Sequence, residues 1–306
     1  MDGELTEPAR SRAAAPAQGA SLAPLVVFNP AAGQRKARRL ARALALLSRG
    51  GSAPELARTM ARGDAEALAR RAPLGRTVIV AGGDGTVNEA VNGRLASGGG
   101  RLAVIPLGTA NVLAAELGID SLAQAAAAAA GGRPLACRPG IANGRAFLLM
   151  AGAGFDAHVV AGVSPRLKRA LGKGAYVLEM LRQLFRFSFP AYRVRVDGVV
   201  HEAASVVVAR GRFYGGRFVL APAARLERAA LHVCLFRRGG PWRAIRYAVA
   251  LALGRLPWLA DVEILRGERI EIEGPPGDPV QGDGDIIARL PVAIELSPVA
   301  LELMRP

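Results

Sequence analysis

Three short glycine-containing segments combine residue types that can hold a phosphate group. They read NPAAG at 29–33, GGDGT at 82–86 and GTAN at 108–111. Glycine allows the backbone to approach a ligand closely, and a helix that follows such a loop offers unpaired N–H groups and the positive end of its dipole. Asp84 stands at the centre of the second segment, and an anion that faces a phosphate needs a cation between them. These residues therefore favour Mg²⁺ together with a nucleotide.

Taken alone, GGDGT is equally compatible with a tight turn closed by an Asx cap. The other two segments favour the nucleotide, because they occupy equivalent places in neighbouring strand–helix units. No GxxxxGK[ST] motif occurs, which excludes a P-loop NTPase, and no GxGxxG fingerprint follows the first apolar run.

The elements that must position these segments are visible as uninterrupted apolar runs. LVVF at 25–28, TVIVAGG at 77–83 and RLAVIPLG at 101–108 predict buried strands, and each precedes a stretch with helical spacing. Strands that alternate with helices predict a parallel sheet covered on both faces. Ligands of such sheets bind at the carboxyl ends of the strands, where the three segments would meet.

The pattern changes near residue 134. Alternating polar and apolar residues in YRVRVDG at 192–198 and RIEIEG at 269–274 predict antiparallel strands with one exposed face. Helical spacing returns at 166–186 and 241–254. The second half therefore predicts a mainly β domain. Residues 1–21 lack the apolar core of a signal peptide, and we expect a disordered tail there.

Composition limits the classes of partner. The net charge of +15 attracts nucleotides, anionic lipids or nucleic acid, but no nucleic-acid recognition motif is present, so we expect no nucleic-acid partner. The two cysteines are isolated and the three histidines show no metal-ligand spacing. No run approaches 18 uncharged apolar residues. We expect a cytoplasmic protein that touches the inner face of the membrane at its periphery.

Six segments carry a resemblance to a known family. VVFNPAAG, GGDGTVNEAVNG, IPLGTANVLAAELGI, MAGAGFDAHV, FYGGRFVLAP and GDGD resemble the bacterial lipid kinases of the diacylglycerol kinase catalytic-domain family, in the family's order over residues 25–306. The resemblance implies a three-layer α/β ATP-binding domain over 22–134 and a β-sandwich lipid-substrate domain over 135–291. It also implies an active site in the cleft between them, and a C-terminal segment, about 292–306, that returns to the first domain.

The resemblance also implies roles for particular residues. GDGD aligns with the family's Asp-Gly-Glu, so Asp283 matches the general base and Asp285 replaces the glutamate. A carboxylate here makes chemical sense, because the attacking hydroxyl must lose a proton; alone, the segment reads as a hairpin turn. Asp84 is expected to reach a catalytic Mg²⁺ through ATP. The residues expected to contact ATP are Asn29, Pro30, Gly33, Arg35, Thr59, Gly82, Gly83, Asp84, Gly85, Thr86, Asn88, Glu89, Gly108, Thr109 and Asn111.

The sequence departs from the family's pattern at several acidic positions. Val112 and Arg138 stand where the family has Asp, and Ala115 stands where it has Arg. Residues 226–230, LERAA, replace an Asp-Asp-Gly that helps bind a structural Mg²⁺, so we expect that site to be absent. The opposite charges of Glu116 and Arg138 suggest that the two pair with each other.

Our first interpretation is the ATP-dependent phosphorylation of a lipid hydroxyl at a membrane surface. Residues 241–258 mix Trp and Tyr with Arg, which suits a bilayer interface, although a helix packed on the sandwich with an exposed Arg edge is the simpler explanation. The alternatives are an NAD kinase-like enzyme, which shares GGDGT, and a catalytically weak nucleotide-binding regulator. The sequence names no lipid and leaves a homodimer open.

Overall fold

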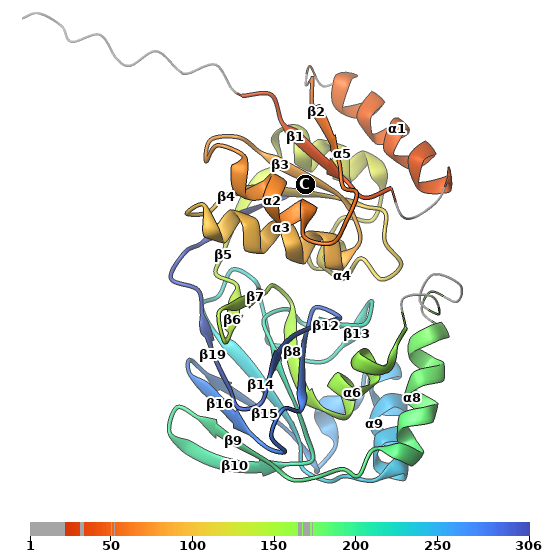
Figure 1. Ribbon diagram of the computed structural model, residues 1–306, viewed down its shortest axis with the longest axis vertical. Coiled ribbons are helices and arrows are strands. Elements are labelled where there is room, and N and C mark those ends of the chain that lie inside the picture. The colour runs from red at the N-terminus through yellow and green to blue at the C-terminus, as the bar shows by residue number, and fades with distance from the viewer. Residues whose placement is uncertain are drawn as a thin grey trace, which may run out of the picture.

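The computed structural model describes residues 22–30, 34–49, 51, 53–164, 167, 172 and 174–306. The expected tail at 1–21, Gly33 and the side chain of Arg35 lie outside this description. The chain folds into two lobes, stacked one above the other in Figure 1.

The first lobe is built on a six-stranded sheet with the order β2-β1-β3-β4-β20-β5. All neighbouring strands are parallel except β20 and β5. β1 and β3 are buried along their whole length, as uninterrupted apolar strands between two helical layers must be. The strands are β1 (Leu25–Phe28), β2 (Glu55–Arg58), β3 (Val78–Gly82), β4 (Gly100–Pro106), β5 (Arg133–Cys137) and β20 (Leu301–Arg305).

Helices cover both faces of this sheet. α1 (Gln34–Arg49) and α5 (Leu122–Gly131) pack on one face, in a core that contains Val26 and Ile79. α2 (Asp64–Arg71) and α3 (Asp84–Ala96) pack on the other, in a core that contains Val27 and Val80, and the short α4 (Val112–Glu116) follows β4. The expected three-layer α/β arrangement is confirmed.

A buried arginine holds α2 to α3. The guanidinium of Arg94 donates to the carbonyl oxygens of Ala72 at 2.6 Å and Leu74 at 3.3 Å, just beyond the end of α2. Gly100 makes room for it, because a Cβ there would overlap the Arg94 guanidinium. The contact fixes the relative position of two helices that both contribute to the site described below.

The second lobe is a β-sandwich of two six-stranded antiparallel sheets within the described residues. The first has the order β10-β9-β16-β19-β6-β7 and the second β15-β14-β11-β8-β17-β18, with a core of aliphatic and aromatic side chains between them. The first comprises β6 (Gly140–Ala142), β7 (Arg145–Phe147), β9 (Tyr192–Val196), β10 (Val199–Ala203), β16 (Ile270–Glu273) and β19 (Val292–Leu296). The second comprises β8 (Met150–Gly154), β11 (Ser205–Ala209), β14 (Leu231–Phe236), β15 (Val262–Gly267), β17 (Pro279–Gly282) and β18 (Asp285–Arg289).

Helices and a small hairpin lie beside the sandwich. They are α6 (Phe155–Gly162), α8 (Gly174–Arg186), α9 (Pro241–Ala252), the 3-10 helix η1 (Leu256–Trp258) and the hairpin β12 (Phe213–Tyr214) and β13 (Phe218–Val219). α8 and α9 lie side by side along one side of the second lobe (Figure 1). None of the helices in the described segments combines the length and the apolar character needed to cross a bilayer.

The chain crosses between the lobes twice. It enters the sandwich after β5 and leaves it after β19, which pairs with β16 and β6. β20 then inserts between β4 and β5 of the first lobe. The sheet that carries the glycine segments is therefore completed by the last residues of the chain.

Candidate active site between the lobes

The glycine segments meet at the carboxyl edge of the first sheet. Gly83 follows β3 and Gly108 follows β4, and a Cβ on Gly108 would lie 2.5 Å from the Cα of Gly83. Asn29, at the end of β1, donates to the hydroxyl of Thr86 at 3.2 Å. Gly82 likewise has a packing role, since its Cβ would lie 2.8 Å from the Cβ of Thr86. These glycines allow the loops to touch each other at the start of α3.

Other expected ATP contacts use their polar groups within the fold. Asn111 adopts a left-handed φ of 50°, and its side chain accepts from the Gly108 N–H at 2.8 Å and donates to the Gly108 carbonyl at 2.9 Å. Thr59 is buried and donates to the carbonyl of Phe28 at 3.4 Å. Thr109 and Pro30 are exposed at the same edge. The chain thus shapes the loops with Asn111 and Thr59, and leaves Thr109 accessible.

Asp84 is the first residue of α3 and reaches the start of α4. Its Oδ1 accepts from the backbone N–H of Leu113 at 3.4 Å. Burial raises the pKa of the Asp84 carboxyl, the Leu113 N–H opposes this shift, and the nearby Asp283 adds to it. A cation would stabilise such a carboxylate.

The residues around Asp84 fit a Mg²⁺ ion that comes with a nucleotide. No group of three or more His, Cys, Asp or Glu in the described part of the chain could hold a metal ion by itself. Mg²⁺ in kinases is commonly held by one or two carboxylates together with the phosphates of the substrate. One buried carboxylate beside a helix N-terminus meets that requirement.

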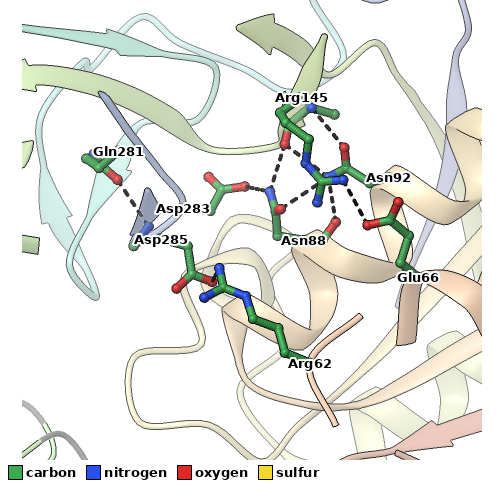
Figure 2. A network of polar contacts seen from close by, with 10 residues as sticks. Arg62, Glu66, Asn88, Asn92, Arg145, Gln281, Asp283 and Asp285 are labelled. Carbon is green, nitrogen blue, oxygen red and sulfur yellow. Dashed lines mark hydrogen bonds and ion pairs between the residues drawn. The ribbon is translucent and has the colours of Figure 1, made fainter. Parts of the chain in front are cut away.

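The carboxylate of Asp283 accepts four hydrogen bonds from the protein. Its Oδ1 accepts from the N–H groups of Leu149 at 2.9 Å and Met150 at 3.1 Å. Its Oδ2 accepts from the Leu148 N–H at 2.7 Å and from the side-chain amide of Asn88 at 2.9 Å (Figure 2). Burial raises the pKa of the Asp283 carboxyl, while these donors act in the opposite direction. A carboxylate has about four lone-pair positions, and all four are used here.

Asp285 lies two residues further on and faces a cavity. Its Oδ2 would be 3.3 Å from a Cβ on Gly85, in the first turn of α3, and it lies 3.7 Å from a guanidinium nitrogen of Arg62 (Figure 2). The cavity has a volume of about 380 Å³ and takes its walls from both lobes. Its lining residues are Arg62, Gly63, Glu66, Asn88 and Glu89 from the first lobe, and Arg145, Asp285, Ile286 and Ile287 from the second.

Three charged residues of this cavity, Arg62, Glu66 and Arg145, had no place in the sequence-based expectations. Arg145 donates to the carboxylate of Glu66 at 2.9 Å and so joins β7 to α2 across the lobes. Arg62 precedes α2 and faces Asp285. No local pattern marks these residues, because they come from segments that are distant in the sequence.

A second network fixes the turn that carries Asp283 and Asp285. The amide of Gln281 donates to Asp156 at 2.7 Å and accepts from the Gly284 N–H at 3.1 Å. The hydroxyl of Tyr214 donates to the other oxygen of Asp156. Burial raises the pKa of the Asp156 carboxyl, against these two donors. Asp156 stands in MAGAGFDAHV, one of the six segments that carry the family resemblance.

The predicted pair of Glu116 and Arg138 is wrong. Glu116 accepts from the Phe213 N–H at 2.6 Å and lies 4.0 Å from the Arg212 guanidinium. Arg138 instead donates to the carbonyl of Ser297 at 2.6 Å. Glu116 thus joins α4 to the β12 strand of the second lobe.

Each lobe matches the model of a known domain family. Residues 23–136 match the diacylglycerol kinase catalytic domain, and residues 150–305 match the YegS C-terminal NAD kinase beta sandwich-like domain. A probable lipid kinase YegS-like protein of Pseudomonas aeruginosa (strain UCBPP-PA14) is 34% identical over 220 residues, which are 65% of this chain and 70% of that protein. The diacylglycerol kinase of Bacillus subtilis (strain 168) is 30% identical over 238 residues, 75% of this chain and 78% of that protein.

A solved structure supports the same fold. The crystal structure of a diacylglycerol kinase from Bacillus anthracis str. Sterne matches with a TM-score of 0.64 and 22% identity, over 92% of this chain and 96% of that one. The chain therefore belongs to the diacylglycerol kinase catalytic-domain family, in which these lipid kinases and diacylglycerol kinases are found, and it is a kinase.

Proposed function

We propose that this kinase transfers the γ-phosphate of ATP to the hydroxyl group of a diacylglycerol-like lipid, with Asp285 as the general base. The observation that carries the proposal is the position of the Asp285 carboxylate, which lies beside Gly85 at the start of α3 and in the cavity between the lobes. The same helix start is suited to the phosphates of ATP, because its N–H groups point out of the helix.

The choice of Asp285 changes the role expected for Asp283. A general base needs a free lone pair within hydrogen-bond distance of the hydroxyl. Asp283 has its oxygens occupied by four N–H donors, whereas Asp285 is partly exposed in the cavity. Asp283 then anchors the turn, and Asp285 accepts the proton as the hydroxyl oxygen attacks the γ-phosphorus.

The remaining side chains have supporting parts in this scheme. Asp84 would hold the Mg²⁺ of Mg–ATP, and that ion would neutralise negative charge on the phosphates. Arg62 offers a cation next to Asp285 that can contact a phosphate oxygen. Ile286 and Ile287 flank the base with apolar surface, which suits a hydroxyl carried by a lipid.

The test is transfer of label from γ-labelled ATP to a panel of acceptors in mixed micelles. The panel contains diacylglycerol, a sphingoid base, phosphatidylglycerol and a polyprenol, with NAD as a water-soluble acceptor. We expect one labelled lipid, no labelled NADP, and loss of the product in Asp285→Asn but not in Asp120→Asn, an exposed aspartate outside the cavity. Labelled NADP without a labelled lipid would support the NAD kinase-like alternative, and no labelled product would leave only the regulator.

A further inference from the structure

Two helices of the second lobe expose large apolar side chains at regular spacing. On α8, positions 177, 181 and 185 follow one another every four residues, with 178 beside them, and on α9 the spacing is 242, 245 and 249. Residues with these spacings share one face of a helix. The α8–α9 face, as we name it, consists of Val177, Leu178, Leu181, Phe185, Trp242, Ile245, Val249, Leu253 and Trp258.

The exposure of this face is concentrated and extreme. In the described part of the chain sixteen large apolar side chains are exposed, and nine of them belong to it. Phe185 is 87% exposed, Trp242 83% and Trp258 80%. Trp242 and Trp258 are the only two tryptophans of the chain. Such a gathering of exposed apolar residues marks an interaction surface, and tryptophan is characteristic of the interface between water and a bilayer.

The charges around the face have a single sign. Within the described residues of α8, α9, η1 and the turn that joins the last two, the charged side chains that are at least partly exposed are all arginines: Arg182, Arg186, Arg243, Arg246 and Arg255. Glu179 is the one acidic residue within these elements and is buried. The nearby Asp261 is also buried, and it accepts from Arg243, Arg246 and Tyr247. An apolar face rimmed by arginines complements a surface of anionic lipids.

The face is connected to the catalytic turn through α8. α8 packs on α6, and α6 packs on β17 and β18, the strands on either side of the turn. The hydroxyl of Tyr176, the residue before Val177, lies 3.9 Å from the position of a Cβ on Gly284. α8 therefore presents apolar side chains to the outside and a tyrosine to the turn that holds Asp285.

We propose that the α8–α9 face docks on the surface of an anionic bilayer and that α8 thereby brings the cavity to its lipid substrate. The inference rests on the proposed function for the identity of the substrate as a lipid, but the docking itself can be measured without ATP. Insertion of Phe185, Trp242 and Trp258 removes apolar surface from water, and the arginines contact the headgroups.

Tryptophan emission tests the docking directly, because both tryptophans lie on the face. Vesicles of phosphatidylcholine with phosphatidylglycerol should shift the tryptophan emission of the intact protein to the blue. On centrifugation the protein should pellet with the vesicles. Added salt should weaken both effects. The double variant Leu181→Ser/Phe185→Ser should bind these vesicles about tenfold more weakly or worse. The matched control is Val199→Ser/Val200→Ser, which removes two exposed apolar side chains from β10 and should bind like the wild type.

The outcomes separate this proposal from the proposed function. If the wild type shows no emission shift and stays in the supernatant, the docking proposal is overturned, even where lipid in micelles is phosphorylated. If vesicles bind but no lipid is phosphorylated, the docking proposal stands and the proposed function fails. If the wild type is a dimer in solution, the double variant is a monomer and neither binds vesicles, the face is occupied by a second copy and the docking proposal is wrong.

Discussion

At the scale of single residues, two aspartates in one turn have opposite surroundings. Asp283 adopts a left-handed φ of 51° and Gly284 follows with a φ of 87°, so the chain reverses between the two carboxylates. The Asp283 carboxylate accepts from three backbone N–H groups of the second lobe and from the Asn88 side chain of α3, whereas the Asp285 carboxylate lies beside Gly85 in the first turn of α3. The division places a rigid anchor beside a group that remains available to react.

Burial makes the ionised form of the Asp84 carboxyl unfavourable in the folded protein. Its folded pKa is raised, so the folded state binds the proton more tightly than the unfolded state, and stability falls as pH rises from the ordinary carboxyl value, about 4, through the folded value. Asp84→Asn removes this loss. Without ATP the variant should melt roughly 2–5 °C above the wild type at pH 8, and the gap should close toward pH 4.5.

The control for Asp84→Asn is the ligand itself. Mg–ATP should raise the Tm of the wild type and leave the variant almost unchanged, because a ligand stabilises only the state that binds it. A gap in Tm that is the same at pH 8 and pH 4.5, or a variant that is less stable at pH 8, would contradict this account of Asp84.

The residues of the site differ in how far the sequence reveals them. Asp84 stands in a short motif whose glycines predict a loop at the carboxyl edge of the sheet, and the family resemblance implies that the motif of Asp285 lies in the cleft between the domains. Arg62, Arg145 and Gln281 were not, because each acts through a partner that is distant in sequence. The difference between the surroundings of Asp283 and Asp285 depends on which way each side chain points, and a motif does not encode that direction.

At the scale of elements, the loops after β3 and β4 contact each other through glycine backbones. The backbones of Gly83 and Gly108 touch, so a methyl group on Gly108 must push β3 and β4 apart. Gly108→Ala should lower the free energy of unfolding by about 1–3 kcal/mol and weaken Mg–ATP binding. Urea unfolding and nucleotide titration measure the two effects.

Gly131 provides the matched control for Gly108→Ala. It ends α5, and a Cβ there would meet nothing within 4 Å. Gly131→Ala should be neutral or stabilising by up to about 1 kcal/mol. Equal effects of the two substitutions would show that the loop contact does not constrain the fold.

Arg210 joins several segments through a buried guanidinium. It is 1% exposed and donates to the carbonyls of Arg138, Leu226, Arg228 and Ala230 at 2.7–2.9 Å. These are the segments in which the sequence departs from the family's acidic pattern. The guanidinium therefore supplies a cation from within the chain to the carbonyl groups of this loop.

Arg210→Met tests this part of the fold. It leaves four carbonyl groups without their donor, and we expect a loss of about 3–5 kcal/mol in the free energy of unfolding. In Arg228→Met, by contrast, the side chain that changes is exposed and the backbone carbonyl remains, so stability should stay within about 0.5 kcal/mol of the wild type. A small effect of Arg210→Met in urea unfolding would show that the loop is held by other contacts.

At the scale of the whole molecule, the first lobe depends on the last residues of the chain through β20. Leu303 is fully buried, opposite Leu102 of β4 and Leu135 of β5. Leu303→Asp places an unpaired charge in that core and should unfold the first lobe, with loss of Mg–ATP binding and of its helical circular dichroism. Glu302→Gln, on the exposed side of the same strand, should retain both, and retention of ATP binding by Leu303→Asp would contradict the dependence.

The fold class could be predicted from the pattern of the residues, whereas the return of the C-terminal segment to the first lobe was implied only by the family resemblance. Continuous apolar strands before helices indicate a parallel sheet, and alternating strands indicate a sandwich. The position of β20 between β4 and β5 is different, because β20 pairs in parallel with one neighbour and antiparallel with the other. Which neighbours a short strand chooses depends on the assembled sheet, so the pattern of LELMR alone did not specify the pairing.

The most direct test of the account is the rate of γ-phosphate transfer at saturating Mg–ATP to the best lipid acceptor, compared in Asp285→Asn and Asp283→Asn. We predict that Asp285→Asn folds and binds Mg–ATP like the wild type but transfers phosphate about 10²–10⁴ times more slowly. Asp283→Asn should instead melt at a lower temperature, because one of its oxygens becomes an N–H group that faces other donors. A transfer rate in Asp285→Asn within about threefold of the wild type would contradict the assignment of Asp285 as the base.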